Sequence, residues 1–316
     1  SHMGYQSLIV REVMIGAGKE VFLEVGLSES VVEIEEVTVE AGISKDQNVN
    51  PMAGISARSF TVEETERYAG SWGDPARMAS NYAGVFTNGD IYNYIVIRGN
   101  SPNGLIWRME GIPIPNPNHF DVPGATGGPI SIINNNLLAQ SDFFTGAFPA
   151  EYGDGVSGVF DLRLRNGNDQ RREYTAQLGL MGLEIGAEGP FTKKSRASYM
   201  INYRYSLLGL VDELLWVEAL PYYQDLSFKV NVPLKKGAFS AFGFGGASHI
   251  TGVIDDSATS TVNTTHQISQ RSGAKTGIIG FKYTHFITPK TRIITDLAVS
   301  SSRPYIRYDS LIRVCP

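Results

Sequence analysis

The clearest pattern along the chain is an alternation of apolar and polar residues in its second half. It runs through residues 198–205, 225–234 and 279–284, where every second side chain is apolar. In the middle stretch, for example, Leu226, Phe228 and Val230 alternate with Ser227 and Lys229. A period of two predicts antiparallel strands with one apolar and one polar face.

The connections between these predicted strands alternate in length. Short connections are expected at Thr192–Ser195, Lys235–Gly237 and Thr288–Lys290, and long ones at 206–222 and 252–271. The apolar parity also changes near Gly182, which predicts a tight hairpin there. Short turns at one end and longer loops at the other are typical of outer-membrane barrels, with the short turns facing the periplasm.

The middle of the chain, residues 59–170, has a different pattern. Thr61 and Glu64 form a predicted capping box, and Asp74 followed by Pro75 predicts a second helix start. Strand signals follow at 94–98, 106–109 and 159–164, with Gly- and Asn-rich turns between them. This region is therefore expected to be a mixed α/β domain.

The N-terminal part contains three shorter segments. Residues 1–3 are interpreted as a scar of tag removal. Residues 4–34 predict a short β-hairpin with a glycine turn, and 35–58 an extended, β-branched stretch followed by a polar linker. Two strands alone are not independently stable, so either the hairpin completes another part of the protein or the rest of a small domain has been cut away upstream.

Composition narrows the possible classes of protein. With 27 Lys+Arg against 32 Asp+Glu the chain is slightly acidic, so no nucleic-acid partner is expected. Its one cysteine, Cys315, excludes an internal disulfide framework. No run of about 18 apolar residues is present, which excludes a membrane-spanning helix but not a barrel of strands.

Signals for catalysis or a cofactor are weak. The run from Gly153 to Gly158 matches a dinucleotide-binding pattern, but it precedes a predicted strand instead of following one, so a glycine turn is the better interpretation. No two histidines stand at a metal-ligand spacing, and no serine-nucleophile elbow occurs. We expect no enzyme activity, cofactor or metal. The stretch 207–220 is open to two interpretations, a core helix or a helical insert in an outer loop.

Several motifs in the middle of the chain together resemble the plug of TonB-dependent outer-membrane receptors. The similar stretches are Glu35–Ala41 (the TonB box), Ile97–Gly99 (I-R-G), Glu110–Pro113 (usually D-G-I-P) and Ala150–Gly153 with Ser157–Leu162 (the closing motif). Ser157 stands where the family usually has glycine. The order and spacing of the motifs make the resemblance specific.

The resemblance implies a domain order and a fold class. Residues 4–34 resemble the last strands of a carboxypeptidase-regulatory-like β-sandwich of Bacteroidetes-type receptors, 35–58 the TonB box and linker, and 59–170 the plug. Residues 171–316 would be the first strands of the barrel. The fold class expected is a mixed α/β plug domain followed by antiparallel strands of an incomplete transmembrane β-barrel. The boxes usual in sugar importers are absent, which weakens a glycan assignment.

The resemblance also implies partners and site residues. The protein would lie in the cell outer membrane, contact its lipid, and bind TonB, with ExbB and ExbD acting indirectly. The ligand would be a small molecule, peptide or glycan. The TonB-binding residues would be Glu35, Glu36, Val37, Thr38 and Val39, although the same stretch could be an ordinary edge strand of the upstream sandwich.

Two further groups of residues are candidates within the plug. Arg98, on a strand and directly before glycine, is expected to aim its guanidinium at barrel carboxylates, and Glu110 is the second candidate for locking plug to barrel. Asn116, Asn118 and His119 are candidates for contact with the ligand.

A second function remains open, a soluble β-rich binding module of the carbohydrate-binding or adhesin type. A sandwich would hide its apolar faces, whereas barrel strands expose theirs to lipid. The period-two segments predict about seven strands, against about 22 for a plugged barrel. We therefore expect a fragment that transports nothing by itself.

Overall fold

The computed structural model describes residues 48–314, except 51, 54–55, 69, 72, 90–92, 121–126, 180–181, 193–195, 208–219, 256–263 and 289–290. The chain divides into two compact units, Ser1–Gln47 and Asn48–Pro316, and everything described below belongs to the second. The hairpin expected over 4–34, the stretch 35–41 and most of 207–220 lie outside the described residues.

The first part of this unit contains short elements. They are β1 (Ala57–Phe60), α1 (Val62–Arg67), α2 (Pro75–Ala79), β2 (Val85–Thr87), β3 (Ile95–Ile97), η1 (Pro102–Gly104), β4 (Leu105–Met109), β5 (Ile112–Ile114), β6 (Asn118–His119), β7 (Ile130–Ser131), η2 (Asn135–Leu137), β8 (Ser141–Phe144), η3 (Ala150–Tyr152) and β9 (Gly158–Leu162). A five-stranded sheet, in the order β1-β8-β9-β4-β5, is its centre. Only β4 and β9 run parallel within it.

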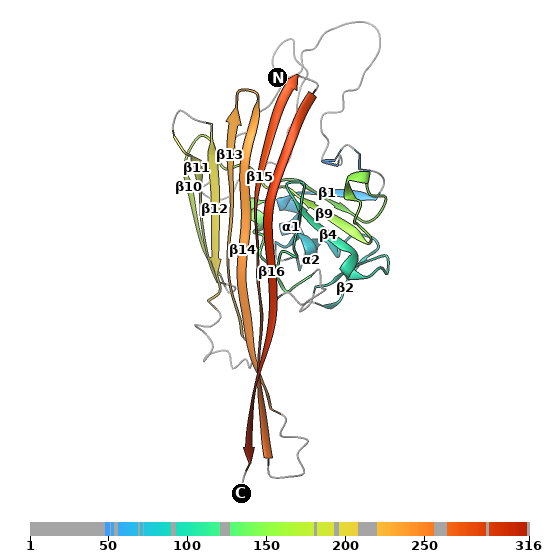
Figure 1. Cartoon of the computed structure of the whole chain (residues 1–316), viewed down its shortest axis with the longest axis vertical. Helices are drawn as coiled ribbons and strands as arrows, with labels where there is room; N and C mark the ends of the chain where they lie inside the picture. Colours follow the sequence, from blue (N-terminus) through green and yellow to red (C-terminus); the bar gives the residue numbers. More distant parts are fainter. Residues whose placement is uncertain are drawn as a thin grey trace. The chain divides into compact units, whose positions relative to one another are not determined.

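The second part is a single sheet of long strands. They are β10 (Glu173–Gly179), β11 (Gly182–Pro190), β12 (Ser198–Tyr205), β13 (Leu220–Leu234), β14 (Gly237–Asp255), β15 (Thr264–Thr288) and β16 (Thr291–Val314). These seven strands pair in sequence order, each antiparallel to the next, as Figure 1 shows. The sheet is open, with β10 and β16 at its two edges in the described part of the chain.

Both predicted helix starts are confirmed. The Thr61 side chain accepts from the Glu64 N–H, and the Glu64 carboxylate accepts from the Thr61 N–H at 2.9 Å. Asp74 caps α2 by accepting from the Ala76 N–H at 2.8 Å, with Pro75 at the first helical position. The side chains therefore satisfy backbone donors that a helix start leaves without partners.

An aromatic stack forms the core beside the five-stranded sheet. The Phe160 ring stacks on those of Trp107 and Phe143, with 4.3 Å between ring centroids in each pair. Phe60 meets the Phe160 ring edge-on. Because these residues come from β1, β4, β8 and β9, the stack joins strands that are distant in sequence. Pro113, which has no N–H to donate, lies on the edge strand β5.

Residues 48–50, expected to belong to a linker, contact the five-stranded sheet. The buried Asp142 carboxylate on β8 accepts from the N–H groups of Val49 (3.0 Å) and Asn50 (2.7 Å) and from the Ser59 hydroxyl. The Asn50 amide in turn donates to Glu151 and, at 3.0 Å, to the Tyr152 hydroxyl. These contacts together are called the clasp at Asp142. No hydrophobic periodicity predicts it, because it consists of polar contacts to residues about a hundred positions away.

The tight turns expected near Gly182 and at Lys235–Gly237 are confirmed by the pairing of their strands, and both long connections are shorter than expected. The one expected over 206–222 ends early, because β13 begins at Leu220. β10 and β11 pair up to Gly179 and Gly182, and β13 and β14 up to Leu234 and Gly237. The long connection expected over 252–271 is wrong in extent, because β14 and β15 stay paired as far as Asp255 and Gln267. A polar strand next to a paired neighbour satisfies its backbone groups without any apolar alternation, so the sequence pattern underestimates its length.

Candidate functional site: a polar contact between two sheets

The seven-stranded sheet has two unlike faces. On β13, Asp225, Ser227 and Lys229 are buried, whereas the alternate residue Leu226 is 39% exposed. The strand register places further large apolar residues on the same outward face. Exposed members of this outward face are Ile185, Ile201, Leu226, Ile279, Phe281, Tyr283, Leu297 and Val299. The buried face therefore carries the charged side chains, and the exposed face carries large apolar ones.

A carboxylate at the centre of this polar face has two partners. Asp225 on β13 pairs in register with Arg204 on β12. The guanidinium makes a bidentate contact with it, Nε to Oδ1 at 2.9 Å and Nη2 to Oδ2 at 2.8 Å. Arg204 Nη2 also donates to the carbonyl oxygens of Ser131 (2.6 Å) and Ile132 (2.9 Å), in the segment before η2. A fork of donors in fixed geometry thus joins the long strands to the preceding domain.

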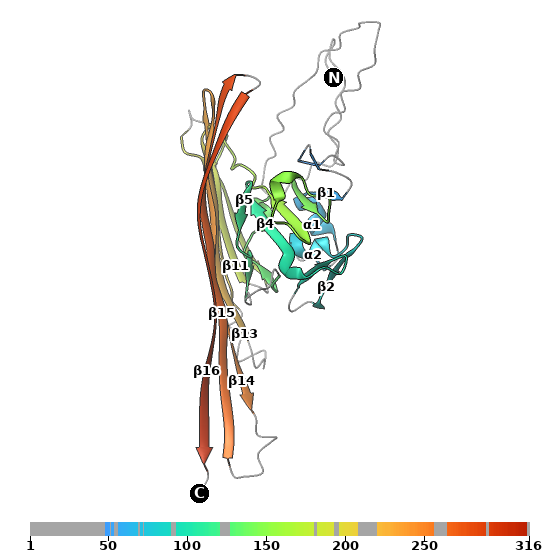
Figure 2. The ribbon, with the colours of Figure 1, turned by 45° about the vertical axis from the view of Figure 1, so that its right-hand side comes forward.

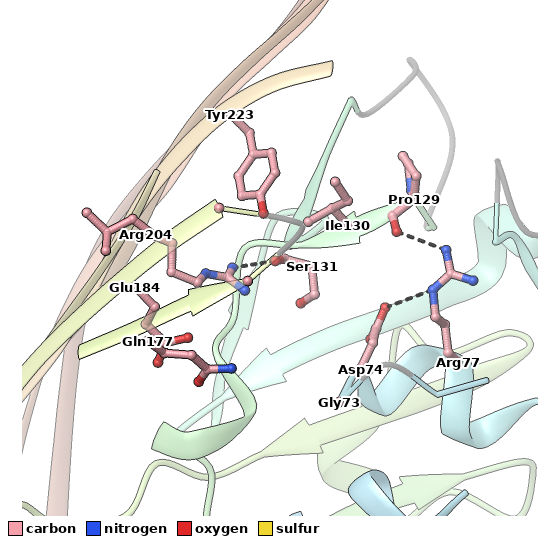
Figure 3. A pocket seen from close by; sticks show the side chains of 13 residues that line it. Gly73, Asp74, Arg77, Pro129, Ile130, Ser131, Gln177, Glu184, Arg204 and Tyr223 are labelled. Carbon is pink, nitrogen blue, oxygen red and sulfur yellow. Dashed lines mark hydrogen bonds and ion pairs between the residues drawn. The ribbon is translucent and has the colours of Figure 1, made fainter. Parts of the chain in front are cut away.

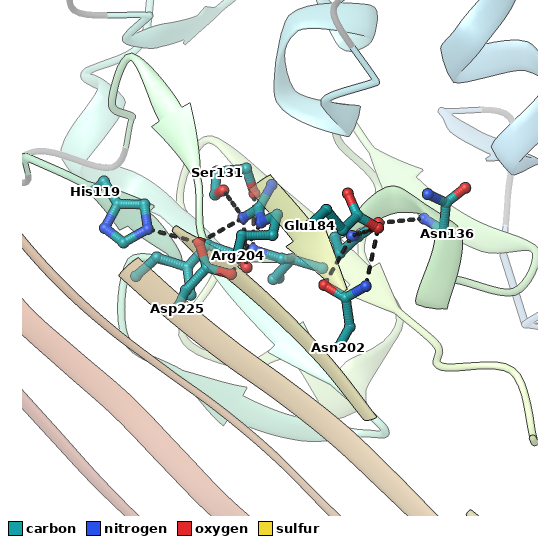
Figure 4. A network of polar contacts seen from close by, with 10 residues as sticks. His119, Ser131, Asn136, Glu184, Asn202, Arg204 and Asp225 are labelled. Carbon is teal, nitrogen blue, oxygen red and sulfur yellow. Dashed lines mark hydrogen bonds and ion pairs between the residues drawn. The ribbon is translucent and has the colours of Figure 1, made fainter. Parts of the chain in front are cut away.

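His119 is the second partner of Asp225. Its Nε2 lies 2.9 Å from Asp225 Oδ2, and both side chains are 1% exposed. Burial disfavours the charged imidazolium and lowers the pKa of His119, and the Asp225 hydrogen bond opposes this only in part. Gly246 on β14 makes room for the ring, since a Cβ there would lie 2.7 Å from His119 Cε1. Figure 4 shows His119, Arg204 and Asp225 turned toward one another.

Three more polar clusters follow the same face. In the first, Asn134 Nδ2 donates to Glu184 Oε1 (2.7 Å) and to Asn202 Oδ1 (3.0 Å). In the second, Lys229 Nζ donates to Glu110 Oε1 (3.0 Å). In the third, Arg165 forms a bidentate pair with Glu188, the Nη2–Oε1 distance being 2.8 Å. Each cluster pairs a residue of the long strands with one from the domain before them.

Apolar side chains fill the space between these clusters. Met200, Phe242, Phe244 and Ile278 point from the long strands into the same buried cluster as the aromatic stack. Gly280 leaves the space that the Phe242 ring occupies, since a Cβ there would lie 2.5 Å from Phe242 Cζ. The contact therefore combines shape-matched apolar packing with directional ion pairs. Figure 2 shows the small sheet beside the long strands.

The predicted residues fall in different places. Glu110 reaches the long strands, and its backbone carbonyl also accepts from Lys282 on β15. Arg98, with a φ of 50°, is exposed and donates to Ser56 Oγ at 3.4 Å. Within the described residues it forms no ion pair with the long strands. Its locking role stays a prediction.

The candidate ligand residues are largely internal. Asn118 and His119 are buried on β6, and Asn116 Nδ2 donates to the Gly127 carbonyl at 2.9 Å. A ligand would reach them only after this segment moves, and their binding role remains a prediction. Glu35, Glu36, Val37, Thr38 and Val39 lie outside the described residues.

The sequence analysis did not identify the residues of the long strands that pair with the preceding domain. Arg204, Asp225 and Lys229 each occupy a polar position of an alternating strand, so their burial could be suspected from the pattern. Their partners could not, because His119 and Asp225 are 106 residues apart and Glu110 and Lys229 are 119 apart.

The contact of Asp225 with Arg204 and His119 is called the polar contact below. A pocket of about 290 Å³ lies beside it. Its walls come from α2, from the residues around β7, and from strands β10 to β13, as Figure 3 shows. Asp74, Arg77, Glu184, Arg204 and Tyr223 contribute polar atoms to it. In the described residues, the pocket included, no group of three or more His, Cys, Asp or Glu side chains is placed to hold a metal ion. Among those residues, too, no helix combines the length and apolar character needed to cross a membrane.

Comparisons with known proteins give only distant likenesses. No protein-family model matches the chain, and no curated protein does. Among solved structures, the siderophore receptor PirA from Acinetobacter baumannii matches 78% of this chain with 11% identity and a TM-score of 0.46. A variant of the ferric enterobactin receptor PfeA from Pseudomonas aeruginosa matches 79% with 12% identity and a TM-score of 0.44. The copper transporter OprC matches 83% with 12% identity and a TM-score of 0.47.

The chain spans less than half the length of these three structures, covering 44%, 45% and 47% of them respectively. Likenesses of this size establish neither a family nor a function for the chain.

Proposed function

We propose that this chain belongs to a TonB-dependent outer-membrane receptor and contributes its plug and the first strands of its barrel. The single observation that carries the proposal is which face of the seven-stranded sheet is buried. The face with the charged side chains is buried against the domain of β1 to β9, whereas the face with the large apolar side chains is exposed. Phe281 is 41% exposed, Leu297 66% and Val299 75%.

This arrangement suits a barrel and not a sandwich. In a sandwich the apolar faces of two sheets pack together and the polar faces meet water. In a membrane barrel the apolar face meets lipid and the polar face lines the lumen. The strands β13 to β16 have 15, 19, 25 and 24 residues, longer than the roughly 9–11 that cross a bilayer. The soluble binding module is therefore the less favoured function.

Within this proposal the domain of β1 to β9 is the plug, and the four polar clusters hold it inside the lumen. Glu110 with Lys229 and Lys282 is one such lock. Ion pairs and hydrogen bonds suit this role, because they are directional and can exchange for water when the plug moves. Apolar packing alone would not offer that exchange.

The coupling mechanism extends the proposal to the segment before residue 48. Residues 35–41 would bind TonB by adding a strand to its sheet edge, so that main-chain hydrogen bonds bear the pull. The polar residues after them would pass the force to the plug. The ligand could be a small molecule, a peptide or a glycan, and the energy for its uptake would come from TonB.

A pull-down with the C-terminal domain of TonB tests the coupling. Val37→Pro removes a ladder donor and should abolish capture, whereas Val37→Thr keeps both the N–H and the β-branched shape and should preserve it. If capture survives both Val37→Pro and deletion of 35–41, the coupling role is wrong.

Neighbouring residues of β16 test the membrane assignment. Val299 belongs to the outward face, and Ala298 packs partly against the core cluster. In the full-length receptor, with Cys315 changed to Ser, a fluorophore on V299C should be quenched by nitroxides on lipid chains. A fluorophore on A298C should not. Equal quenching of both, or of neither, would contradict a lipid-facing sheet.

A further inference from the structure

One carboxylate that lines the pocket, that of Asp74, has a buried oxygen without a hydrogen bond among the described residues. Asp74 is only 6% exposed. Its Oδ1 accepts from the Ala76 N–H, but its Oδ2 has no hydrogen-bond partner among the described residues. The nearest cationic group, Arg77 Nε, lies 4.0 Å away, too far for a hydrogen bond. Removal from water raises the pKa of Asp74 to about 6, which still leaves most of the group ionised at pH 7.

The charges around the pocket do not balance. Asp74 stands beside Arg77, and Arg204 is held by Asp225. The hydrogen bonds of Glu184 come from the neutral amides of Asn134 and Asn202, both to Oε1, and the positive charge nearby, that of Arg204, is already paired with Asp225. One negative charge is therefore in excess around the pocket, and a cation entering it would be favoured.

The other walls restrict what kind of cation fits. Tyr223 points its hydroxyl toward the pocket in Figure 3, and a hydroxyl oxygen can accept a hydrogen bond from a cation. Gln177, on the exposed side of the pocket, can donate and accept hydrogen bonds. A volume of about 290 Å³ lies at the lower edge of small-molecule pockets, so the occupant must be small.

We propose that this pocket binds a small polar molecule carrying a primary ammonium group. The ammonium donates to Asp74 Oδ2, and Glu184 supplies the excess negative charge that selects a cation over an anion. The polar remainder of the ligand meets Gln177 and Tyr223. A metal ion is not the occupant we expect, because the described residues around the pocket offer too few ligating groups.

The use of such a site rests on the proposed function, whereas binding itself does not. Pro129, Ile130 and Ser131 form one wall, and Ile130 pairs with His119 across β6 and β7. An occupied pocket would therefore lie directly beside the hydrogen bond between His119 and Asp225. In a plugged barrel the pocket would be a binding site along the transport path of an amine-bearing ligand.

Saturation-transfer NMR on the purified full chain in detergent micelles tests the proposal without TonB. The probes are ethanolamine, ethylene glycol as its uncharged analogue, and glycolate as its anionic analogue. Ethanolamine should bind at least tenfold more tightly than either analogue. Asp74→Asn keeps the acceptor for the Ala76 N–H but removes the charge, and should weaken ethanolamine binding at least tenfold. Glu184→Gln should weaken it about threefold.

Asp169→Asn is the matched control, since it removes a carboxylate of a surface ion pair with Arg196 and should leave binding unchanged. Thermal melting of each variant checks that it is folded. Equal binding of ethanolamine to Asp74→Asn and the parent chain, or tighter binding of glycolate, would overturn the proposal. So would the absence of ethanolamine binding to the folded parent chain. None of these outcomes bears on TonB capture, so failure here and failure of the proposed function are separable.

Discussion

Two buried regions of the described residues differ in how many polar groups they contain. Beside the five-stranded sheet, the stack of Phe143, Phe160 and Trp107 is apolar, and its geometry is that of ring packing. Between the domain of β1 to β9 and the long strands, the carboxylate of Asp225 is hydrogen-bonded to the half-buried Arg204 and the buried His119. A buried position in this protein can therefore be apolar or ionic, and the two regions should respond differently to the same kind of change.

The largest expected effect comes from removing the shared carboxylate. Asp225→Ala leaves the Arg204 guanidinium and His119 without their partner, and unpaired buried charge costs about 3–5 kcal/mol. Denaturant unfolding of the full chain in detergent should show this loss. Asp169→Ala breaks the surface pair with Arg196, which is worth about 1 kcal/mol or less. Similar losses from both variants would show that the polar contact contributes no more than a surface pair.

A smaller effect is expected from a methyl group at Gly246. The added Cβ would overlap His119 Cε1 at 2.7 Å and Ile132 at 3.0 Å. Overpacking of this kind costs about 1–3 kcal/mol, and less if the Ile132 side chain moves aside. Gly245→Ala is the control, because the nearest atom to its Cβ would be Thr276 O at 3.9 Å. If unfolding free energies change equally for the two, the ring of His119 is not held as tightly as described.

The pH dependence should separate Asp74 from His119. The pKa of Asp74 is raised to about 6 by burial, so the folded state binds more protons than the unfolded state between about pH 4 and 6. Its contribution to stability therefore increases as the pH falls from 7 to 5, by about 1.4 kcal/mol. Burial lowers the pKa of His119, so its contribution decreases as the pH falls below about 6.5.

Unfolding curves at pH 7 and pH 5 check both signs. Asp74→Asn should remove the increase in unfolding free energy at pH 5. His119→Gln should remove the decrease that opposes it. If the unfolding free energy changes between pH 7 and pH 5 by the same amount in both variants, the assignment of these two groups is wrong.

The smallest expected effect is on the outward face. Leu297→Thr alters a side chain that is 66% exposed, and in detergent the unfolding free energy should change by about 0.5 kcal/mol or less. In lipid vesicles the same variant should be less stable relative to the parent, since the apolar face then has a lipid partner. A large loss in detergent would indicate that another protein surface covers this face.

The sequence predicts the local structure of this chain better than its contacts. Thr61 and Asp74 identify helix starts because capping depends on neighbouring residues. The strands of the long sheet follow from a period of two, and Lys235–Gly237 from turn chemistry. The clasp at Asp142, the partner of His119 and the full length of β14 and β15 follow from pairings across long separations, which no local pattern encodes. A motif identifies Glu110, but its partners Lys229 and Lys282 come only from the fold.

The clasp at Asp142 has a mechanical consequence. A single carboxylate receives the N–H groups of Val49 and Asn50 and the Ser59 hydroxyl, while the Asn50 amide is held separately by Glu151 and Tyr152. Tension applied at residue 48 would be shared among these bonds before it reached β1, so they would carry the load in parallel. Bonds loaded in parallel fail together at a higher force than bonds opened one after another. The first rupture event in a pulling experiment should therefore be the release of Asn50, and Asp142→Ala should lower the force at which it occurs.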